Sequence, residues 1–288
     1  MKLIKDTNIL IVGLGVIGGG YAKALTKQGF RVNAITLEEQ TVQYALEHGM
    51  IANGTTSLDP EMISSADLVV FALYPQVFIH WIWSNQHLFK SGAMITDVTG
   101  VKRCVVETVQ TILRPDVEFI AAHPMAGRER SGVEYADDKV FQGANFIVTP
   151  TEKNTPEAIA TAKELGSLLG FTRITELSPQ KHDEMIAFLS QLTHCIAVTL
   201  MTCNDSPSLE EYTGDSFRDL TRIAKINDEM WSELFLLNRD ALLCEMDRFS
   251  TEFARLREML ATGDREGMRD MMRRSTVRRA SFDKPTTK

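Results

Sequence analysis

The stretch NILIVGLGVIGGG, residues 8–20, decides the fold of this 288-residue chain. Its first five residues have the pattern of a buried strand, and Gly13, Gly15 and Gly18 then follow with the spacing GxGxxG before a helical pattern at 21–27. Gly13 would permit the tight turn, Gly15 would let the backbone approach a pyrophosphate, and Gly18 would let helix and strand pack closely. Amide groups at the helix N-terminus would hold the phosphates. The stretch, with Leu14, Val16 and Ile17 between the glycines, therefore predicts a dinucleotide site.

Two further segments belong to this predicted site. The residue expected to hold the adenine ribose, about twenty positions after the glycines, is Thr36 rather than an acid. Glu38 and Glu39 follow it and would oppose a 2'-phosphate, so the segment favours NAD and leaves NADP open. Leu73, Tyr74 and Pro75 end a predicted strand, which places them either beside the cofactor or simply at a strand end.

The first half of the chain alternates short apolar runs with helical patterns, which is typical of a parallel sheet covered by helices. The predicted strands are Asn8–Val12, Arg31–Ile35, Leu68–Leu73, Ala93–Thr96, Glu118–Ala121, Asn145–Thr149 and Phe171–Thr175. The helix Pro156–Leu169 is predicted before the last of them, because Thr155 and Pro156 form a helix start. Residues 1–177 are thus expected to form a Rossmann-type, doubly wound α/β domain.

After Ser178 and Pro179 the strand patterns stop and long helical patterns begin. They cover Lys181–Met201, Ser216–Ile226 and Asp228–Leu260. We expect residues 178–288 to form an all-α domain that binds substrate and joins two copies into a homodimer, an expectation that rests on analogy with other helical second domains.

Composition excludes several classes of protein. A net charge of -7 speaks against a nucleic-acid binder, which would need a basic surface. The four cysteines lie far apart and form no Cys/His cluster, so we expect no metal site, and reduced thiols fit the cytoplasm. No targeting segment is visible and no apolar run approaches the roughly 18 residues of a spanning helix, so no membrane contact is expected.

His123 is the first candidate for chemistry. It lies in FIAAHPMAGRERSGVE, residues 119–134, and is expected at the carboxyl end of the strand Glu118–Ala121, facing the cleft. A neutral imidazole there can accept a proton from a hydroxyl while hydride leaves the same carbon. A histidine after a strand is more often structural, so the position alone does not assign the role.

The segment AHPMAGRERSGVE resembles the His-Pro-Met-Ala-Gly signature of the prephenate and arogenate dehydrogenases. Further likenesses follow in order along residues 8–250, and they are Ser178-Pro179 with His182-Asp183, Ser190–His194, Phe217–Ala224, and Met230 with Trp231. The resemblance implies a tyrosine-pathway enzyme that oxidises and decarboxylates prephenate to 4-hydroxyphenylpyruvate, or arogenate to tyrosine. It also implies NAD or NADP as the cofactor.

The resemblance assigns roles to single residues. His123 would accept the proton of the ring hydroxyl, and Arg222 would bind a substrate carboxylate with bidentate geometry. His194 would lie near the substrate, with His182 as a supporting, interface or core residue. Trp231 and Glu129 resemble residues that gate the pocket, although a core tryptophan and a surface glutamate are the plain alternatives. His182 and His194 are twelve residues apart, which on one straight helix separates them by about 120°.

One segment departs from the family pattern. Where the family commonly has Gly-Ser before Val-Lys, this chain has Thr99 and Gly100 before Val101 and Lys102, so the hydroxyl lies one place earlier. Thr99 is predicted to reach the nicotinamide or the substrate hydroxyl because Gly100 frees the turn. Lys102 is either a loop support or a surface charge.

Two other functions compete with this interpretation. A β-hydroxyacid dehydrogenase or imine reductase would be expected to carry a lysine early in the first long helix after the sheet, and none occurs between His182 and Asn204. A nucleotide-sensing protein without chemistry would need neither His123 nor Arg222. The choice between prephenate and arogenate depends on one pocket residue, for which Asn227 and Asp228 are candidates.

Overall fold

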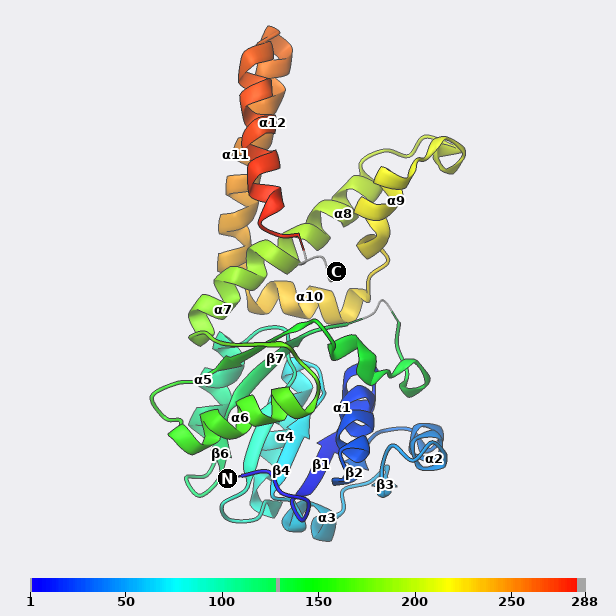
Figure 1. Cartoon of the computed structure of the whole chain (residues 1–288), viewed down its shortest axis with the longest axis vertical. Helices are drawn as coiled ribbons and strands as arrows, with labels where there is room; N and C mark the ends of the chain where they lie inside the picture. The colour runs from blue at the N-terminus through cyan, green and yellow to red at the C-terminus, as the bar shows by residue number, and fades with distance from the viewer. Residues whose placement is uncertain (1, 128–129, 284–288) are drawn as a thin grey trace. The chain divides into compact units, whose positions relative to one another are not determined.

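The computed structural model describes residues 2–127 and 130–283 (Figure 1). The chain divides into two compact units, Met1–Arg239 and Asp240–Lys288, and each is described by itself. The division that the sequence predicts near residue 177 stays a prediction.

The first unit is built on a six-stranded parallel sheet. Its strands are β1 (Asn8–Val12), β2 (Arg31–Ile35), β3 (Asn53–Thr55), β4 (Leu68–Phe71), β5 (Met94–Asp97) and β6 (Glu118–Phe119). They lie in the order β3-β2-β1-β4-β5-β6, and Ile9 of β1 pairs with Val32 on one side and Leu68 on the other. This order reverses direction between β1 and β4, which is where a Rossmann-type sheet binds its ligand. The predicted fold class is confirmed.

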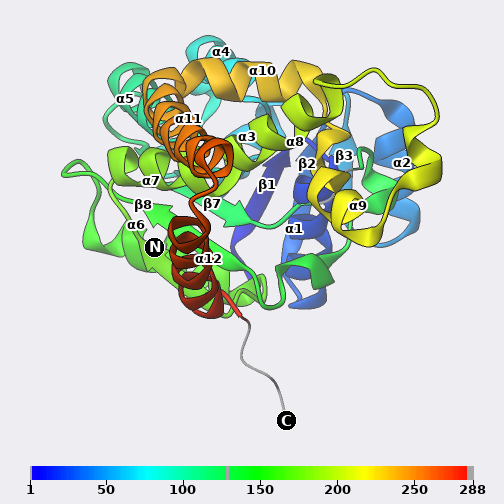
Figure 2. The ribbon, with the colours of Figure 1, turned by 90° about the horizontal axis from the view of Figure 1, so that it is seen from above.

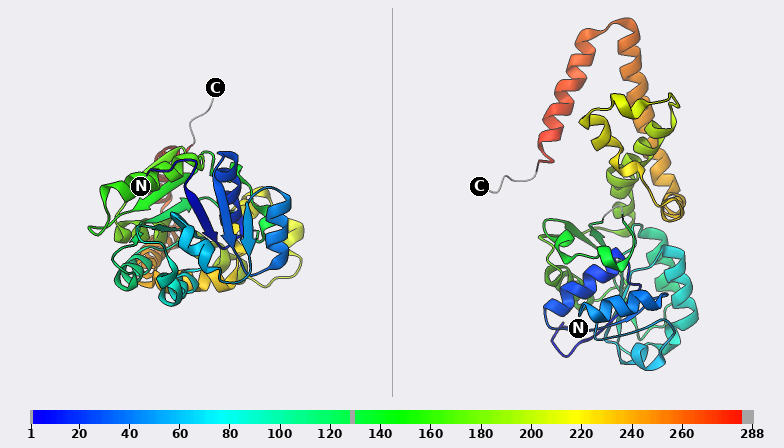
Figure 3. Two further views of the ribbon diagram at one scale, coloured as in Figure 1. Left: turned by 90° about the horizontal axis from the view of Figure 1, so that it is seen from below. Right: turned by 90° about the vertical axis from the view of Figure 1, so that its right-hand side faces the viewer.

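Helices cover both faces of this sheet because the buried strands are apolar on both sides. In β1, Ile9 and Ile11 belong to one core cluster, whereas Leu10 and Val12 belong to the other. The first cluster includes residues of α1 (Val16–Lys27), α2 (Glu39–Glu47) and α6 (Pro156–Leu168), and the second includes residues of α3 (Pro60–Ser65), α4 (Pro75–Asn85) and α5 (Arg103–Ile112). Figures 2 and 3 show α1 and α6 on one side of the sheet and α4 and α5 on the other.

A second, three-stranded sheet was not predicted. It contains β7 (Ala121–Met125), β8 (Asn145–Thr149) and β9 (Arg173–Glu176), with β7 antiparallel to β8 and β8 parallel to β9. The predicted strand Glu118–Ala121 is therefore wrong as one element, because it divides at Ile120 between the two sheets. The Asp97 carboxylate accepts the Ala122 N–H at 3.2 Å, where a parallel strand would offer a carbonyl, and the chain leaves the first sheet there.

Helices follow β9 in the first unit. They are α7 (Pro179–Ile186), a π-helical segment (Ala187–Gln191), α8 (Leu192–Thr202), α9 (Asp215–Thr221), a 3-10 turn (Arg222–Ala224) and α10 (Asp228–Leu237). Ser178 caps α7 by accepting the Lys181 N–H at 3.2 Å, as its Ser-Pro start predicts. The single predicted helix Lys181–Met201 is thus divided by the π-helical segment.

The predicted helix Asp228–Leu260 is also divided, at Asn238. The side chain of this buried residue donates to the Asp183 carbonyl oxygen at 2.9 Å and to Gln191 Oε1 at 2.8 Å. Its backbone, with φ of -119°, ends α10, and its side chain joins this helix end to α7 and to the π-helical segment.

Taken together, α7, the π-helical segment and α8 form a helix, Pro179–Thr202, that is long and apolar enough to cross a membrane by length and composition. No such apolar run was predicted from the sequence. The core helix of a soluble protein meets the same criteria, and this helix buries His182 and Asp183 near its start. We interpret it as the central helix of the helical region.

The second unit is a helical hairpin. α11 (Arg239–Thr262) supplies its first helix and α12 (Arg265–Ala280) its second, and Gly263 joins them with a φ of +70° that favours glycine (Figure 3). Its exposed large apolar residues include Leu243, Met246, Phe249, Phe253, Leu260, Met272, Val277 and Phe282. A two-helix hairpin cannot bury such a set by itself.

Candidate active site

The glycine loop after β1 has the geometry of a phosphate site. Gly13 has a φ of +97°, and a Cβ there would overlap the Ala72 carbonyl oxygen. A Cβ on Gly18 would overlap the Gly13 carbonyl oxygen, so both glycines are required for packing. Gly15 has open space at its Cβ position and begins α1 with no side-chain cap and no acid in the first turn. The loop is thus suited to a pyrophosphate, whose oxygens would accept hydrogen bonds from the first N–H groups of α1.

The other predicted cofactor residues surround this loop. Leu14 and Val16 are buried and Ile17 is half-buried, so the loop would offer a ligand mainly its backbone. Thr36 follows β2 and donates its N–H to the Thr55 carbonyl oxygen at 3.1 Å. Glu38 and Glu39 follow at the start of α2, and they place negative charge near the predicted position of the adenine ribose.

On the neighbouring strand, Leu73 lies against Gly13, and its Cδ2 would be 2.9 Å from a Cβ on that glycine. Tyr74 and Pro75 begin α4. The three predicted residues therefore follow β4 at the point where the strand order reverses, directly beside the glycine loop.

Helix α10 lies over the carboxyl-terminal edge of the sheet (Figure 1). Asn227 at its start donates to the Tyr74 hydroxyl at 3.2 Å, and Glu233 accepts the Gln76 N–H at 2.8 Å. Further along, Leu234 joins the core cluster of Val101. The loops after β4 and β5 are thus covered by the helical region rather than left open to solvent.

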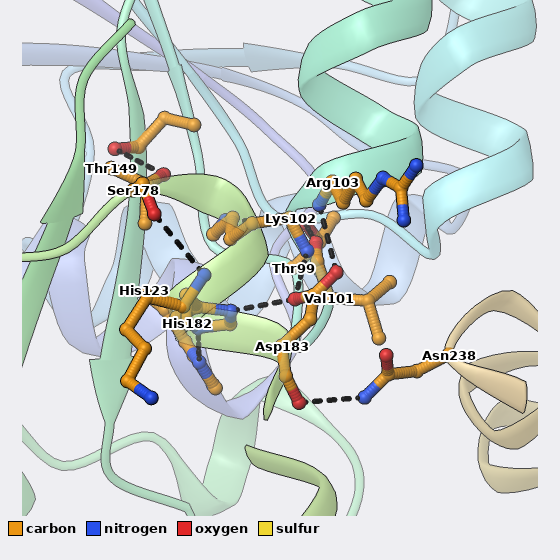
Figure 4. A network of polar contacts seen from close by, with 12 residues as sticks. Thr99, Val101, Lys102, Arg103, His123, Thr149, Ser178, His182, Asp183 and Asn238 are labelled. Atoms are coloured by element: carbon orange, nitrogen blue, oxygen red, sulfur yellow. Dashed lines mark hydrogen bonds and ion pairs between the residues drawn. The ribbon is translucent and has the colours of Figure 1, made fainter. Parts of the chain in front are cut away.

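His123 lies within β7, opposite Ile147 of β8, rather than at the end of a strand in the first sheet as predicted. Its half-buried imidazole contacts His182 of α7, with 2.8 Å between His123 Nδ1 and His182 Nε2 (Figure 4). Burial lowers the pKa of His123 well below its usual range, and the nearby His182 and Lys102 lower the pKa further. His123 is therefore neutral at neutral pH and can act as a base.

His182 is fully buried and is held by its neighbour Asp183, with 2.7 Å between Nδ1 and Oδ1. The Asp183 carboxylate also accepts the N–H groups of Lys102 and Arg103, both at 2.8 Å, at the start of α5 (Figure 4). Burial lowers the pKa of His182 although the hydrogen bond to Asp183 opposes that change. α7 is thus attached to α5 through one buried carboxylate.

Thr99 and Lys102 belong to a buried polar cluster beside His123. Lys102 Nζ lies 2.6 Å from Asp97 Oδ2, and neither side chain is exposed at all. The Thr99 hydroxyl hydrogen-bonds the same carboxylate, lies 2.9 Å from the Val101 carbonyl oxygen, and accepts from Lys102 Nζ at 3.2 Å. Lys102 is therefore a loop support and not a surface charge.

The predicted catalytic contact of Thr99 would use a hydroxyl that these bonds already engage, and it stays a prediction. Gly100 has no positive φ, so its freedom does not arise from a left-handed turn.

The predicted substrate residues lie on the helices after α7. The His194 ring packs against Trp231, with 3.7 Å between the ring centroids and 30° between the ring planes, and His194 Nδ1 lies 2.8 Å from the Ser190 carbonyl oxygen. The turn that carries Arg222 packs against α8. The π-helical segment lies between His182 and His194, and because such a bulge adds one residue to a turn, it reduces their angular offset from about 120° to about 20°. Glu129 lies outside the described residues.

Sequence reasoning missed three residues of this site, Asp97, Gln191 and Asn238. Asp97 could have been found, because an acid that ends a buried strand needs a buried partner and Lys102 follows five residues later. Gln191 and Asn238 carried no such signal. Gln191 donates to the Leu234 carbonyl oxygen at 3.0 Å and accepts from Asn238, a contact that only the folded chain creates.

The sheet with its glycine loop, covered by helices and flanked by a neutral histidine, defines an NAD(P)-dependent oxidoreductase. The family model "Prephenate dehydrogenase, nucleotide-binding domain" matches residues 21–173, and "Prephenate dehydrogenase, dimerization domain" matches residues 178–274. The chain belongs to the prephenate dehydrogenase family.

Individual relatives agree with this assignment. The chain is 31% identical to a prephenate dehydrogenase of Bacillus subtilis, over 93% of this chain and 74% of that one. It is 28% identical to a cyclohexadienyl dehydrogenase of Zymomonas mobilis, over 89% of each chain. Among solved structures, the prephenate dehydrogenase of Aquifex aeolicus in complex with hydroxyphenyl propionate and NAD+ matches with a TM-score of 0.90 and 28% identity, over 98% of this chain and 100% of that one.

Proposed function

We propose that this enzyme oxidises and decarboxylates prephenate to 4-hydroxyphenylpyruvate in tyrosine biosynthesis, with NAD as the preferred cofactor. The observation that carries the proposal is His123. It is a neutral imidazole whose Nδ1 is engaged by His182, and its Nε2 has no hydrogen-bond partner within residues 2–127 and 130–283. That nitrogen is therefore available to a substrate hydroxyl.

The chemistry needs one proton acceptor and one hydride acceptor. When bound, NAD would accept the hydride from the ring carbon that carries the hydroxyl. His123 takes the hydroxyl proton through Nε2 as the carbonyl forms. Carbon dioxide then leaves as the ring becomes aromatic, and the phenolate oxygen takes the proton back from His123. Because its pKa is lowered, the His123 imidazole stays unprotonated over the neutral pH range.

The substrate itself would bind to the helical region. Arg222 is suited to a carboxylate because its planar guanidinium offers two parallel donors. His194 and Trp231 form a tilted ring pair that would contact the ring of the substrate. Thr99 and the gating residue Glu129 are the remaining members of the proposed site.

The preference for NAD rests on charge at the ribose end. Glu38 and Glu39, the N-cap and first residue of α2, lie two and three residues after Thr36 and would repel the 2'-phosphate of NADP. Asn227, one candidate for choosing between prephenate and arogenate, already caps α10 by accepting the Met230 N–H at 2.9 Å. Asp228 is exposed in the same first turn and would suit the ammonium of arogenate, which is the alternative substrate.

We also propose that the enzyme is a cytoplasmic homodimer. The match of residues 178–274 to a dimerization domain supports this, as do the exposed apolar residues of the helical hairpin. A second copy of the chain would cover a surface that a two-helix hairpin cannot bury alone.

The test is to follow nicotinamide absorbance with NAD and NADP, offering prephenate and arogenate separately. The proposal predicts the highest kcat/KM with prephenate and NAD. A higher kcat/KM with arogenate would make arogenate, rather than prephenate, the proposed substrate. No absorbance change in any of the four combinations, with nucleotide still bound, would refute the proposed reaction. His123→Asn serves as the site control, because it should keep nucleotide affinity and lose most of the turnover.

A further inference from the structure

An unbroken chain of hydrogen bonds joins the start of α5 to His123. The N–H groups of Lys102 and Arg103 donate to Asp183, Asp183 binds His182 Nδ1 at 2.7 Å, and His182 Nε2 lies 2.8 Å from His123 Nδ1. His182 is not exposed at all and Asp183 only 4%, so solvent does not compete for these bonds (Figure 4). Of the atoms in this series of hydrogen-bonded residues, the proposed reaction uses only the His123 Nε2.

The direction of each bond follows from the fixed donors. The two backbone amides can only donate, so Asp183 serves as an acceptor, and the hydrogen between Asp183 and His182 must lie on His182 Nδ1. A neutral His182 then has a lone pair on Nε2 and accepts from His123 Nδ1. A neutral His123 that donates through Nδ1 has its lone pair on Nε2. The Asp183 carboxylate, two hydrogen bonds away from His123, therefore selects the only tautomer of His123 that can accept a proton from substrate.

We propose that His182 and Asp183 are positioning residues that hold His123 in its Nδ1–H tautomer and compensate the positive charge when Nε2 takes the substrate proton. This deepens the proposed function and depends on it. No proton beyond that one needs to move. The hydroxyl proton binds His123 Nε2, and His123 becomes an imidazolium that still donates to His182. Bound NAD would accept the electron pair of the carbon–hydrogen bond as hydride.

The charges of the residues around His123 and His182 favour protonation of His123 by the substrate. The buried cluster contains the carboxylates of Asp97 and Asp183 and the ammonium of Lys102, with His123 and His182 neutral. Their sum is -1 before the proton arrives and 0 afterwards. In a medium of low dielectric constant, a proton that neutralises a buried negative charge is favoured over one that creates a new positive charge.

The sharpest test is Asp183→Asn. An asparagine can present its amide N–H to His182 Nδ1, which would reverse both hydrogen bonds and place the hydrogen of His123 on Nε2. We expect kcat to fall on the order of 10² to 10⁴-fold with little change in KM or nucleotide affinity, as for loss of the orienting carboxylate in a catalytic triad. Imidazole nitrogen NMR should report Nδ1–H for His123 in the wild type and Nε2–H in the variant. An unchanged tautomer, or a kcat within about threefold of wild type in a folded variant, would overturn the proposal.

A second pair of variants leaves the Asp183 cap in place. His182→Gln offers a carbonyl oxygen to His123 Nδ1, whereas His182→Phe offers nothing, so the phenylalanine variant should be at least tenfold slower. Equal rates for the two would also overturn the proposal. The matched control is Asp59→Asn, in which a carboxylate that caps α3 through the Met62 N–H at 3.0 Å loses its charge away from the site. Its kcat should not change.

The NMR measurement separates this inference from the proposed function, because it needs no substrate. If prephenate and arogenate are both inert but His123 carries its hydrogen on Nδ1 and changes tautomer in Asp183→Asn, the proposed reaction fails and the tautomer assignment stands. If turnover occurs and the tautomer is Nε2–H in the wild type, the assignment alone fails.

Discussion

Replacing Lys102 with methionine should destabilise the first unit strongly, because the change leaves a carboxylate buried without its countercharge. Lys102 Nζ and Asp97 Oδ2 are 2.6 Å apart and both side chains have an exposed fraction of 0%. Methionine keeps much of the length and apolar volume of lysine, so the loss of the charge dominates. Asp97 would keep only its hydrogen bonds to Thr99 and to the Ala122 N–H.

Breaking a buried pair by removing one partner typically costs about 3 to 5 kcal/mol. For a unit of this size, each kcal/mol lowers Tm by roughly 2 to 4 °C, so the expected fall is about 6 to 20 °C. Urea unfolding followed by tryptophan fluorescence is the suitable assay, since the three tryptophans, Trp81, Trp83 and Trp231, all lie in the first unit. The second unit then contributes no tryptophan signal.

The matched control is Lys27→Met. Lys27 Nζ and Asp138 Oδ1 are also 2.6 Å apart, but the side chains are 54% and 16% exposed. Exposed pairs contribute about 0 to 1 kcal/mol, so this variant should unfold close to wild type. If Lys102→Met costs less than about 1 kcal/mol, or no more than Lys27→Met, the reasoning from burial is refuted.

Three further predictions follow from the site. Arg222→Gln should raise KM for the substrate about tenfold or more with a smaller change in kcat, because it removes a bidentate carboxylate contact, and an unchanged KM in steady-state kinetics would contradict this. Gly18→Ala should weaken NAD binding at least tenfold by calorimetry, since its Cβ would overlap the Gly13 carbonyl oxygen and shift the loop; wild-type affinity would show that the loop adapts. The lowered pKa values of His123 and His182 mean that the unfolded chain binds protons that the folded chain does not, so this contribution to stability is complete above about pH 6.5 and declines as the pH falls below it; a urea midpoint that rises on acidification would contradict the sign.

Local patterns predicted the elements whose own residues have a clear strand or helix pattern. β1 and β2 begin and end where predicted, and the glycine loop follows β1 with the expected geometry. β3 was not predicted, because its residues Asn53–Thr55 have little strand preference and pair only at the edge of the sheet. The second sheet was not predicted either, since the change of sheet at Ile120 coincides with a contact between distant residues, the Ala122 N–H and the Asp97 carboxylate 25 residues earlier.

The sequence by itself determined the class of fold, the dinucleotide loop and the choice of His123 as the candidate base. Each of these depends on patterns of residues that are close together in the chain. Only the tertiary structure decided the partners of those residues. It brought His182 to His123 across 59 residues, placed Asp183 at the start of α5, and buried Lys102 against Asp97. A residue pattern specifies which side chains are buried or polar, whereas the direction of a hydrogen bond and the pairing of a buried charge depend on how distant segments pack.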